Sequence, residues 1–280
     1  MFYETVDLYE YFSVPREGKT GGLLTVYARN KYKEIKEKIR PAMLVLPGGG
    51  YGFVSEREAE PIAVRFMLAG YAAFVLNYTI HAPFPTPLIE AAMAMAFIRE
   101  NAEKYGADRE HAGAVGFSAG GHLTGMLATM FADERVKKAL GKRASLARPD
   151  AVVLSYPVIT TGEFTHGGTA ETISGGDAAL RKALSVEERV TEESSPAFIW
   201  HTAEDNAVPV ENSLLLANAY RKKGVPFELH VFAKGWHGLS EVGVEVFDDE
   251  PAPEIARNAA WFDLALSFLK TRGFCVSHKD

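Results

Sequence analysis

The stretch GAVGFSAGGHL, residues 113–123, contains a serine in a setting that could make it a nucleophile. Ser118 is the centre of a G-x-S-x-G pattern that runs from Gly116 to Gly120, directly after an apolar run. A serine on a strained strand-to-helix turn needs small neighbours, because larger side chains would collide with the strand and the helix. A tight structural corner would also suit these residues. The apolar run before Ser118 and the helical pattern after it favour the nucleophile.

A serine hydroxyl needs a base to take its proton near neutral pH. Of the eight histidines, His237 in KGWHGLS is best placed, since it follows the last predicted core strand. The base in turn needs a buried carboxylate that holds its tautomer. Asp205 in HTAEDNAVPV follows another predicted strand, with the adjacent Glu204 as a rival, and the Asp-x-x-Val-Pro spacing favours Asp205. Ser118, Asp205 and His237 thus follow the order nucleophile, acid, base.

Backbone N–H groups that could stabilise an oxyanion are expected in LPGGGYG, residues 46–52. The three consecutive glycines 48–50 leave their amides unobstructed, and one or two of them could act together with the N–H of Ala119. A dinucleotide-binding G-x-G-x-x-G pattern fails here, because the sixth position counted from Gly48 is Phe53. A purely structural turn remains the alternative.

Other side chains adjoin these predicted loops. We expect His122, in the first turn of the helix after Ser118, to support the wall of the site, and His201 to line it from a strand end. Tyr51, Tyr156 and Trp236 could bind substrate by stacking on a sugar or another alcohol portion, and packing in the core or at the rim suits each of them equally. The remaining histidines are expected to be packed, solvated or locally bonded: His81, His111, His166, His230 and His278.

Composition excludes several classes of function. The 280 residues are 47% hydrophobic and 24% charged with a formal net charge of −6, and Lys and Arg are scattered, which argues against a nucleic-acid partner. No apolar run is long enough to span a bilayer, so we expect no membrane partner. Neither H-E-x-x-H nor a cysteine cluster occurs, so no metal and no cofactor is expected. Self-association into a homo-oligomer is left open.

The N-terminus and the cysteine content bear on the compartment of the protein. The N-terminal MFYETVDLYEYF has no basic segment leading into an apolar one, so it does not resemble a secretory signal. The single cysteine, Cys275, allows no intrachain disulfide and suits a reducing compartment. We therefore expect a cytoplasmic enzyme, although a trimmed sequence would hide an export signal.

The elements that must position these residues alternate along the chain. Short, continuously apolar runs predict strands covered on both faces, as in a parallel sheet. Helical patterns with good start and stop residues lie between them, with Thr86 as an expected N-cap and Gly106 and Gly224 at helix ends. The predicted strands are 42–46, 72–77, 112–116, 151–155, 197–201 and 228–232, and the predicted helices are 61–70, 86–106, 210–224 and 252–270.

Two further segments complete the predicted fold. The N-terminal GGLLTVYA indicates an antiparallel hairpin at the edge of a doubly wound, mostly parallel α/β sheet. Residues 161–195 are polar, glycine-rich and long for a connector, which suits a lid or binding-loop insertion as well as a plain surface loop. We predict a single domain over residues 1–280.

These motifs, taken in order, resemble the α/β-hydrolase superfamily over nearly the whole chain. VLPGGGY, FVLNY, KYGAD, GFSAGGHL and the pair DNAVPVENS and GWHGL are similar to those of small bacterial acetyl esterases and acetylxylan esterases. The resemblance implies Ser118 as nucleophile, Asp205 as acid and His237 as base. It also implies that Gly49, Gly50 and Ala119 are the oxyanion donors: all six assignments come from matching positions. Lipase-like relatives carry histidine before the glycines, where this chain has Pro47, so other hydrogen bonds must support that loop.

The resulting expectation is a serine carboxylesterase that cleaves short-chain acyl esters through an acyl-enzyme. Acetyl is the expected acyl group, and acetylated xylo-oligosaccharides are a candidate substrate. An amidase, a formamidase or a serine peptidase-like hydrolase on the same fold is the alternative. A second alternative is a non-catalytic binding protein of the hydrolase fold, which would be expected to lack part of the triad.

Overall fold

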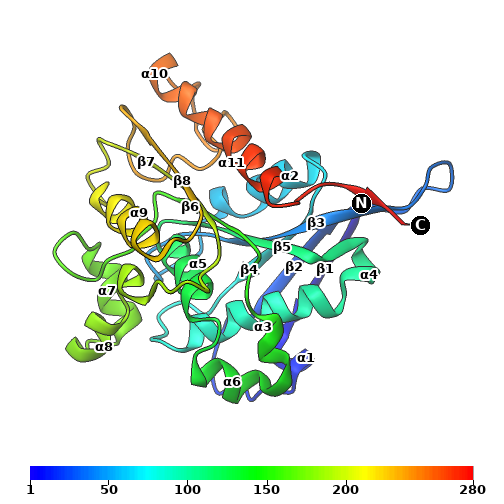
Figure 1. Ribbon diagram of the computed structural model, residues 1–280, viewed down its shortest axis with the longest axis horizontal. Coiled ribbons are helices and arrows are strands. Elements are labelled where there is room, and N and C mark those ends of the chain that lie inside the picture. The colour runs from blue at the N-terminus through cyan, green and yellow to red at the C-terminus, as the bar shows by residue number, and fades with distance from the viewer. Residues whose placement is uncertain (280) are drawn as a thin grey trace.

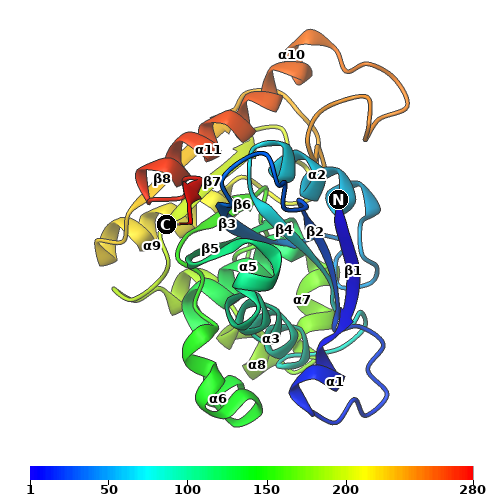
Figure 2. The same cartoon turned by 90° about the vertical axis from the view of Figure 1, so that its right-hand side faces the viewer.

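A nine-stranded mixed sheet forms the centre of the molecule, and helices cover both of its faces (Figures 1 and 2). The computed structural model describes residues 1–279; residue 280, the last of the predicted domain, lies outside them. The strand order is β1-β2-β4-β3-β5-β6-β7-β8, and β9 pairs with β3. The strands are β1 (Phe2–Asp7), β2 (Leu23–Ala28), β3 (Lys38–Leu46), β4 (Ala72–Asn77), β5 (Ala107–Phe117), β6 (Val152–Ser155), β7 (Ala197–Thr202), β8 (Phe227–Phe232) and β9 (Ser277–His278).

The predicted sheet class is confirmed. Strands β4, β3, β5, β6, β7 and β8 pair in parallel, whereas β1 and β2 form the expected antiparallel hairpin and β2 pairs antiparallel with β4. The pairing of β3 with β5 aligns Leu46 with Gly116. This register brings the glycine loop after β3 beside the serine turn after β5, so two segments about 70 residues apart meet at the carboxyl edge of the sheet.

Two apolar clusters cover the two faces of the sheet. Alternate residues of β3 face opposite sides: Leu44 and Leu46 join one cluster, and Met43 and Val45 join the other. Helices α3, α5 and α9 contribute to the first cluster and α2 and α11 to the second. The longer helices are α2 (Glu60–Leu68), α3 (Thr86–Glu100), α5 (Ala119–Met130), α6 (Glu134–Leu140), α7 (Gly167–Ser174), α9 (Glu211–Lys223) and α11 (Ala260–Thr271). The short helices are α1 (Leu8–Phe12), α4 (Ala102–Tyr105), α8 (Ala178–Ala183) and α10 (Pro253–Ala256).

Helix ends follow the sequence signals only in part. The helix predicted over 86–106 is broken at Asn101 into α3 and α4, and the one predicted over 252–270 is divided into α10 and α11 by a 3₁₀ turn. Gly106 and Gly224 end α4 and α9 in the left-handed conformation, with φ of 61° and 69°. The expected N-cap at Thr86 is wrong, because Thr86 is already the first residue of α3 and Pro85 is the cap. The Thr86 N–H donates to Pro83 in the preceding turn, so the chain enters the helix one residue earlier than expected.

The 161–195 insertion contains α7, α8 and a 3₁₀ turn at Val186–Arg189, and it packs against the body of the protein. Ile173 and Val186 are fully buried in the cluster that also contains α5. The insertion is thus an ordered, docked element, which argues against a loose surface loop. Its function as a lid stays a prediction.

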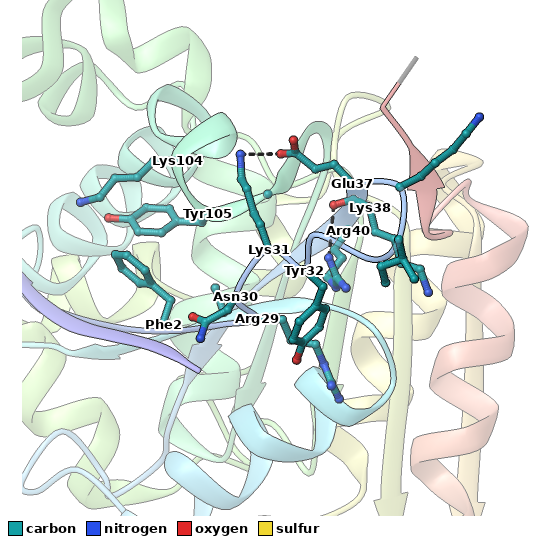
Figure 3. A pocket seen from close by; sticks show the side chains of 14 residues that line it. Phe2, Arg29, Asn30, Lys31, Tyr32, Glu37, Lys38, Arg40, Lys104 and Tyr105 are labelled. Atoms are coloured by element: carbon teal, nitrogen blue, oxygen red, sulfur yellow. Dashed lines mark hydrogen bonds and ion pairs between the residues drawn. The ribbon is translucent and has the colours of Figure 1, made fainter.

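A basic cavity of about 220 Å³ lies at the opposite, amino-terminal edge of the parallel strands (Figure 3). Six of its lining residues are Lys or Arg and one is acidic, and Lys31 pairs with that acid, Glu37, at 2.5 Å. Its lining includes the start of β3 and the end of α4 but none of the predicted catalytic residues. The predicted catalytic residues lie at the carboxyl edge of the sheet, away from this cavity.

Within residues 1–279, no helix combines the length and the hydrophobicity needed to cross a bilayer.

Candidate active site

Ser118 lies on the strained turn that its neighbours indicated. It caps α5 with φ 52° and ψ −118°, a conformation that costs a non-glycine residue about 1–3 kcal/mol. A Cβ at Gly116 would lie 2.0 Å from Thr124 Oγ1, and one at Gly120 would lie 2.1 Å from the Leu46 carbonyl oxygen. Because strand, turn and helix approach so closely, only glycine fits at positions 116 and 120, two residues before and after the serine.

Ser118, His237 and Asp205 form one hydrogen-bonded chain, here called the relay. The Ser118 hydroxyl lies 2.8 Å from His237 Nε2, and His237 Nδ1 lies 2.7 Å from Asp205 Oδ2. The three residues follow the carboxyl ends of β5, β7 and β8. The pKa of Asp205 is held below its ordinary value, so the carboxylate accepts, Nδ1–H donates to it, and Nε2 is left to accept from the serine.

Buried donors keep the Asp205 carboxylate ionised. Burial by itself raises the pKa of Asp205, but hydrogen bonds from His201 and His237 and from the Val208 N–H lower it more, so the net shift is downward. Oδ1 accepts from the N–H groups of Ala207 and Val208 at 3.0 and 2.9 Å.

The rival acids lie outside the relay. Glu204 is exposed and pairs with Lys234. The structure thus brings Asp205, and not Glu204, to the histidine. Asp248 and Asp249, which follow the histidine in the chain, are both exposed.

The glycine loop presents free amides beside the serine. The Gly48 N–H is occupied, since it donates to Glu58 Oε2 at 2.8 Å. For the N–H groups of Gly49, Gly50 and Ala119, no acceptor is found within residues 1–279. Gly49 and Gly50 have φ of 119° and 63°, a region that glycine enters without strain. The three predicted oxyanion donors are therefore available to bind a ligand.

Glu58 and Tyr78 hold this loop in place, and the sequence analysis missed both. Tyr78 donates to the Pro47 carbonyl oxygen at 2.7 Å, which answers how the loop is supported without a histidine at position 47. Glu58, only 3% exposed, accepts from the Gly48 N–H through one oxygen and from the Tyr156 hydroxyl through the other, at 2.7 Å. Tyr156 packs edge-on against the His237 ring, with centroids 5.1 Å apart. Glu58 therefore connects the loop to the base of the relay.

Three of the four residues expected to bind substrate are buried and have partners inside the protein. Tyr51 donates to His122 Nδ1 at 3.0 Å, and His122 Nε2 donates to the Leu184 carbonyl oxygen at 3.0 Å. Burial lowers the pKa of His122 to about 4, so its ring is neutral near pH 7. Tyr156 bonds Glu58 and receives the N–H of Ser240. This placement favours support of the site walls over direct contact with substrate, as was expected for His122.

Trp236, the fourth, is 49% exposed beside His237 and packs edge-on against Phe247. Phe53, next to the glycine loop, is 61% exposed. These two rings are exposed aromatic surfaces next to the predicted catalytic loops. His201 is fully buried, and it lies behind Asp205 and does not line the site: Nδ1 contacts the Ser213 hydroxyl at 2.7 Å and Nε2 lies 3.4 Å from the Asp205 carboxylate.

The remaining histidines mostly take local contacts. His230 stacks on Phe198, and His111 contacts Asp108. His166 is the exception, because it lies in the 161–195 insertion against the glycine loop. No group of three or more His, Cys, Asp or Glu side chains suited to a metal ion is found in the described part of the chain.

Comparison with known proteins identifies the family. The family model described as BD-FAE matches residues 30–220. The chain belongs to the BD-FAE family. Among solved structures, the acetyl ester-xyloside bifunctional hydrolase from Caldicellulosiruptor lactoaceticus is 34% identical, with a TM-score of 0.82 and 97% of each chain covered. A carboxylesterase from Lactobacillus plantarum is 28% identical, with a TM-score of 0.80 and 98% of each chain covered.

Curated relatives of this BD-FAE chain are longer proteins. Acetylxylan esterase of Xylanibacter ruminicola is 29% identical over 207 residues, which cover 71% of this chain and 41% of that protein. Endo-1,4-beta-xylanase B of Butyrivibrio fibrisolvens is 44% identical over 216 residues, 74% of this chain and 34% of that protein. The chain thus spans between a third and a half of these relatives.

The predicted resemblance is confirmed. The BD-FAE chain has the α/β-hydrolase fold, and proteins named esterases and carboxylesterases are among its relatives.

Proposed function

We propose that this hydrolase cleaves short-chain acyl esters, with acetyl groups on xylo-oligosaccharides as the substrate class, through Ser118, His237 and Asp205. The observation that carries the proposal is the relay itself: a serine on a strained turn, 2.8 Å from an imidazole whose other nitrogen lies 2.7 Å from a buried carboxylate. This arrangement suits proton transfer from the hydroxyl to the ring.

In the proposed reaction, Ser118 Oγ attacks the ester carbonyl carbon while His237 Nε2 takes the hydroxyl proton. The N–H groups of Gly49, Gly50 and Ala119 donate hydrogen bonds to the carbonyl oxygen and stabilise the negative charge that develops on it. His237 then gives the proton to the departing alcohol oxygen, which leaves the acyl group on Ser118. A water molecule attacks this acyl-enzyme with His237 again as base, and the acid is released as the serine regains its proton.

The substrate class is supported by the relatives and by the rim of the site. One relative is named an acetylxylan esterase, and one similar solved structure is named an acetyl ester-xyloside bifunctional hydrolase. The exposed rings of Trp236 and Phe53 offer faces on which a sugar ring can pack.

The test is a substrate panel with a matched variant. Purified protein and Ser118→Ala are assayed on p-nitrophenyl esters of increasing chain length, on the corresponding anilides and on acetylated xylo-oligosaccharides. We expect acetyl to be preferred, the sugar acetate to be cleaved and Ser118→Ala to be inactive. Faster cleavage of anilides would favour the amidase or formamidase alternative. Folded protein that never gains mass at Ser118 with a fluorophosphonate would indicate a non-catalytic binding protein.

A further inference from the structure

His166 is a half-buried imidazole that the proposed reaction does not use. It precedes α7, and its Nδ1 lies 3.2 Å from the Thr169 backbone N and 2.9 Å from Thr169 Oγ1. A backbone N–H can only donate, so Nδ1 accepts and carries no hydrogen. The neutral ring then carries its hydrogen on Nε2. In this tautomer His166 is a hydrogen-bond donor at Nε2 and not a second general base.

The His166 ring lies over the glycine loop. A Cβ added at Gly50 would be 3.7 Å from His166 Cε1, the carbon between the two ring nitrogens, and 3.9 Å from Thr169 Oγ1. Within residues 1–279, Nε2 makes no hydrogen bond to the protein. An N–H donor with no protein partner is therefore held at the edge of the predicted oxyanion loop.

The relay is close enough to act on this ring. Burial lowers the pKa of His166, and positive charge on His237 lowers it further, while Asp205 opposes the shift. Protonation of Nδ1 would also break the contact with the Thr169 N–H. Both effects keep the ring neutral while the relay works.

We propose that His166 is a substrate-binding residue whose Nε2–H donates a hydrogen bond to a hydroxyl or ring oxygen in the alcohol portion of the ester. The inference rests on the proposed esterase function. In that reaction the carbonyl oxygen is bound by backbone donors, and a short acyl chain has no acceptor of its own. The alcohol portion is the part of the substrate that has oxygen acceptors left. Sugars and polyols supply such an oxygen, and simple alkyl alcohols do not.

The test variant is His166→Asn, because asparagine is a good N-cap whose side-chain oxygen can accept from the Thr169 N–H, while its NH₂ group is bonded to Cγ and does not reach the position of Nε2. His166→Ser is a second capping variant in case the first does not fold. His278→Asn, at an exposed position in β9, is the matched control. The substrates are glycerol monoacetate and propyl acetate, which share the acyl group and the alcohol chain length but differ in hydroxyls.

We expect the wild-type protein to prefer glycerol monoacetate. In His166→Asn, kcat/KM for this ester should fall about five-fold, as for loss of one neutral hydrogen bond, while kcat/KM for propyl acetate stays within about two-fold. Acetylated xylo-oligosaccharides should behave like the glycerol ester, and the control should match the wild type. The inference is overturned if the wild-type protein does not prefer glycerol monoacetate or if His166→Asn keeps that preference. It is also overturned if His166→Asn loses kcat/KM equally on both esters.

Failure of the proposed function gives a different pattern. If the wild-type protein cleaves neither ester, or if Ser118→Ala is as active as the wild type, the esterase proposal and this inference fall together. If cleavage depends on Ser118 but the hydroxyl preference does not depend on His166, only the inference about His166 falls.

Discussion

Replacing Glu58 by glutamine should slow the reaction although Glu58 touches neither substrate nor relay. Its two carboxylate oxygens each accept from one buried donor, the Gly48 N–H at 2.8 Å and the Tyr156 hydroxyl at 2.7 Å. Glutamine has one carbonyl oxygen and one NH₂ group, and the NH₂ group cannot accept. One of the two donors must therefore lose its acceptor in Glu58→Gln.

The size of the effect follows from the bond that is lost. A hydrogen bond to a charged group is worth about 1.5–3 kcal/mol. The unpaired donor lets the glycine loop or Tyr156 move out of position. The transition state is then less stabilised by about this energy, because the oxyanion donors and the His237 ring must be aligned in it. The corresponding loss of kcat is roughly 10- to 150-fold, with KM changed much less.

The assay is steady-state kinetics on p-nitrophenyl acetate, with thermal unfolding to establish that each variant is folded. Glu56→Gln is the matched control, because Glu56 lies with Glu58 in the 3₁₀ turn Glu56–Glu58, is exposed and undergoes the same change of charge. It should keep wild-type kinetics. A folded Glu58→Gln protein with kcat within two-fold of wild type would refute the positioning role of Glu58.

Three further outcomes are expected. Ser118→Ala should lower kcat by roughly 10⁴-fold or more and leave the protein folded, measured on p-nitrophenyl acetate. Folding lowers the pKa of His122 from 6.5 to about 4, so between pH 6.5 and pH 4 the unfolded chain takes up a proton on this ring and the folded protein does not. The free energy of unfolding should therefore fall by about 3 kcal/mol from this group as pH drops from 6.5 to 4, and urea titrations should show a shallower fall in His122→Gln. Trp236→Ala should raise KM for acetylated xylo-oligosaccharides by up to about ten-fold, the scale of one aromatic contact, with p-nitrophenyl acetate nearly unaffected.

Each of these has an outcome that contradicts it. Ester cleavage by Ser118→Ala at the wild-type rate removes the nucleophile assignment. Equal pH slopes of unfolding in the wild type and His122→Gln contradict the buried neutral ring. If Trp236→Ala loses activity equally on acetylated xylo-oligosaccharides and on p-nitrophenyl acetate, the Trp236 ring packs around His237 and does not bind the sugar.

The positions of Ser118, Asp205 and His237 in the fold were predictable from the residues and predicted strands next to them. Ser118 stands between glycines whose necessity is a local steric matter, and the apolar runs around it predicted β5 and α5 to within a few residues at the serine turn. Asp205 and His237 followed from position, since residues just after the carboxyl ends of parallel strands gather at one edge. Thr86 shows the limit of such signals, because the preceding turn decided where the helix began.

Supporting residues carried no such signal. Glu58 and Glu56 lie two positions apart in a polar stretch, and nothing in their local sequence separates the buried one from the exposed one. Tyr156 and Trp236 both adjoin predicted catalytic loops, yet one is buried under the relay and the other is exposed at its rim. His166 had no pattern around it at all, and its place over Gly50 depends on how the 161–195 insertion docks.

The sequence by itself determined the alternation of strands and helices and the turn at Ser118, because these depend on backbone sterics and on hydrophobic periodicity over short stretches. Only the tertiary structure decided which side chains complete the site. The contacts of Glu58 with Tyr156, and of His166 with Gly50, join segments that are distant in the chain and meet only in the folded molecule. Which of these side chains are buried, and which hydrogen-bond partners they have, depends on tertiary packing and not on any local sequence pattern.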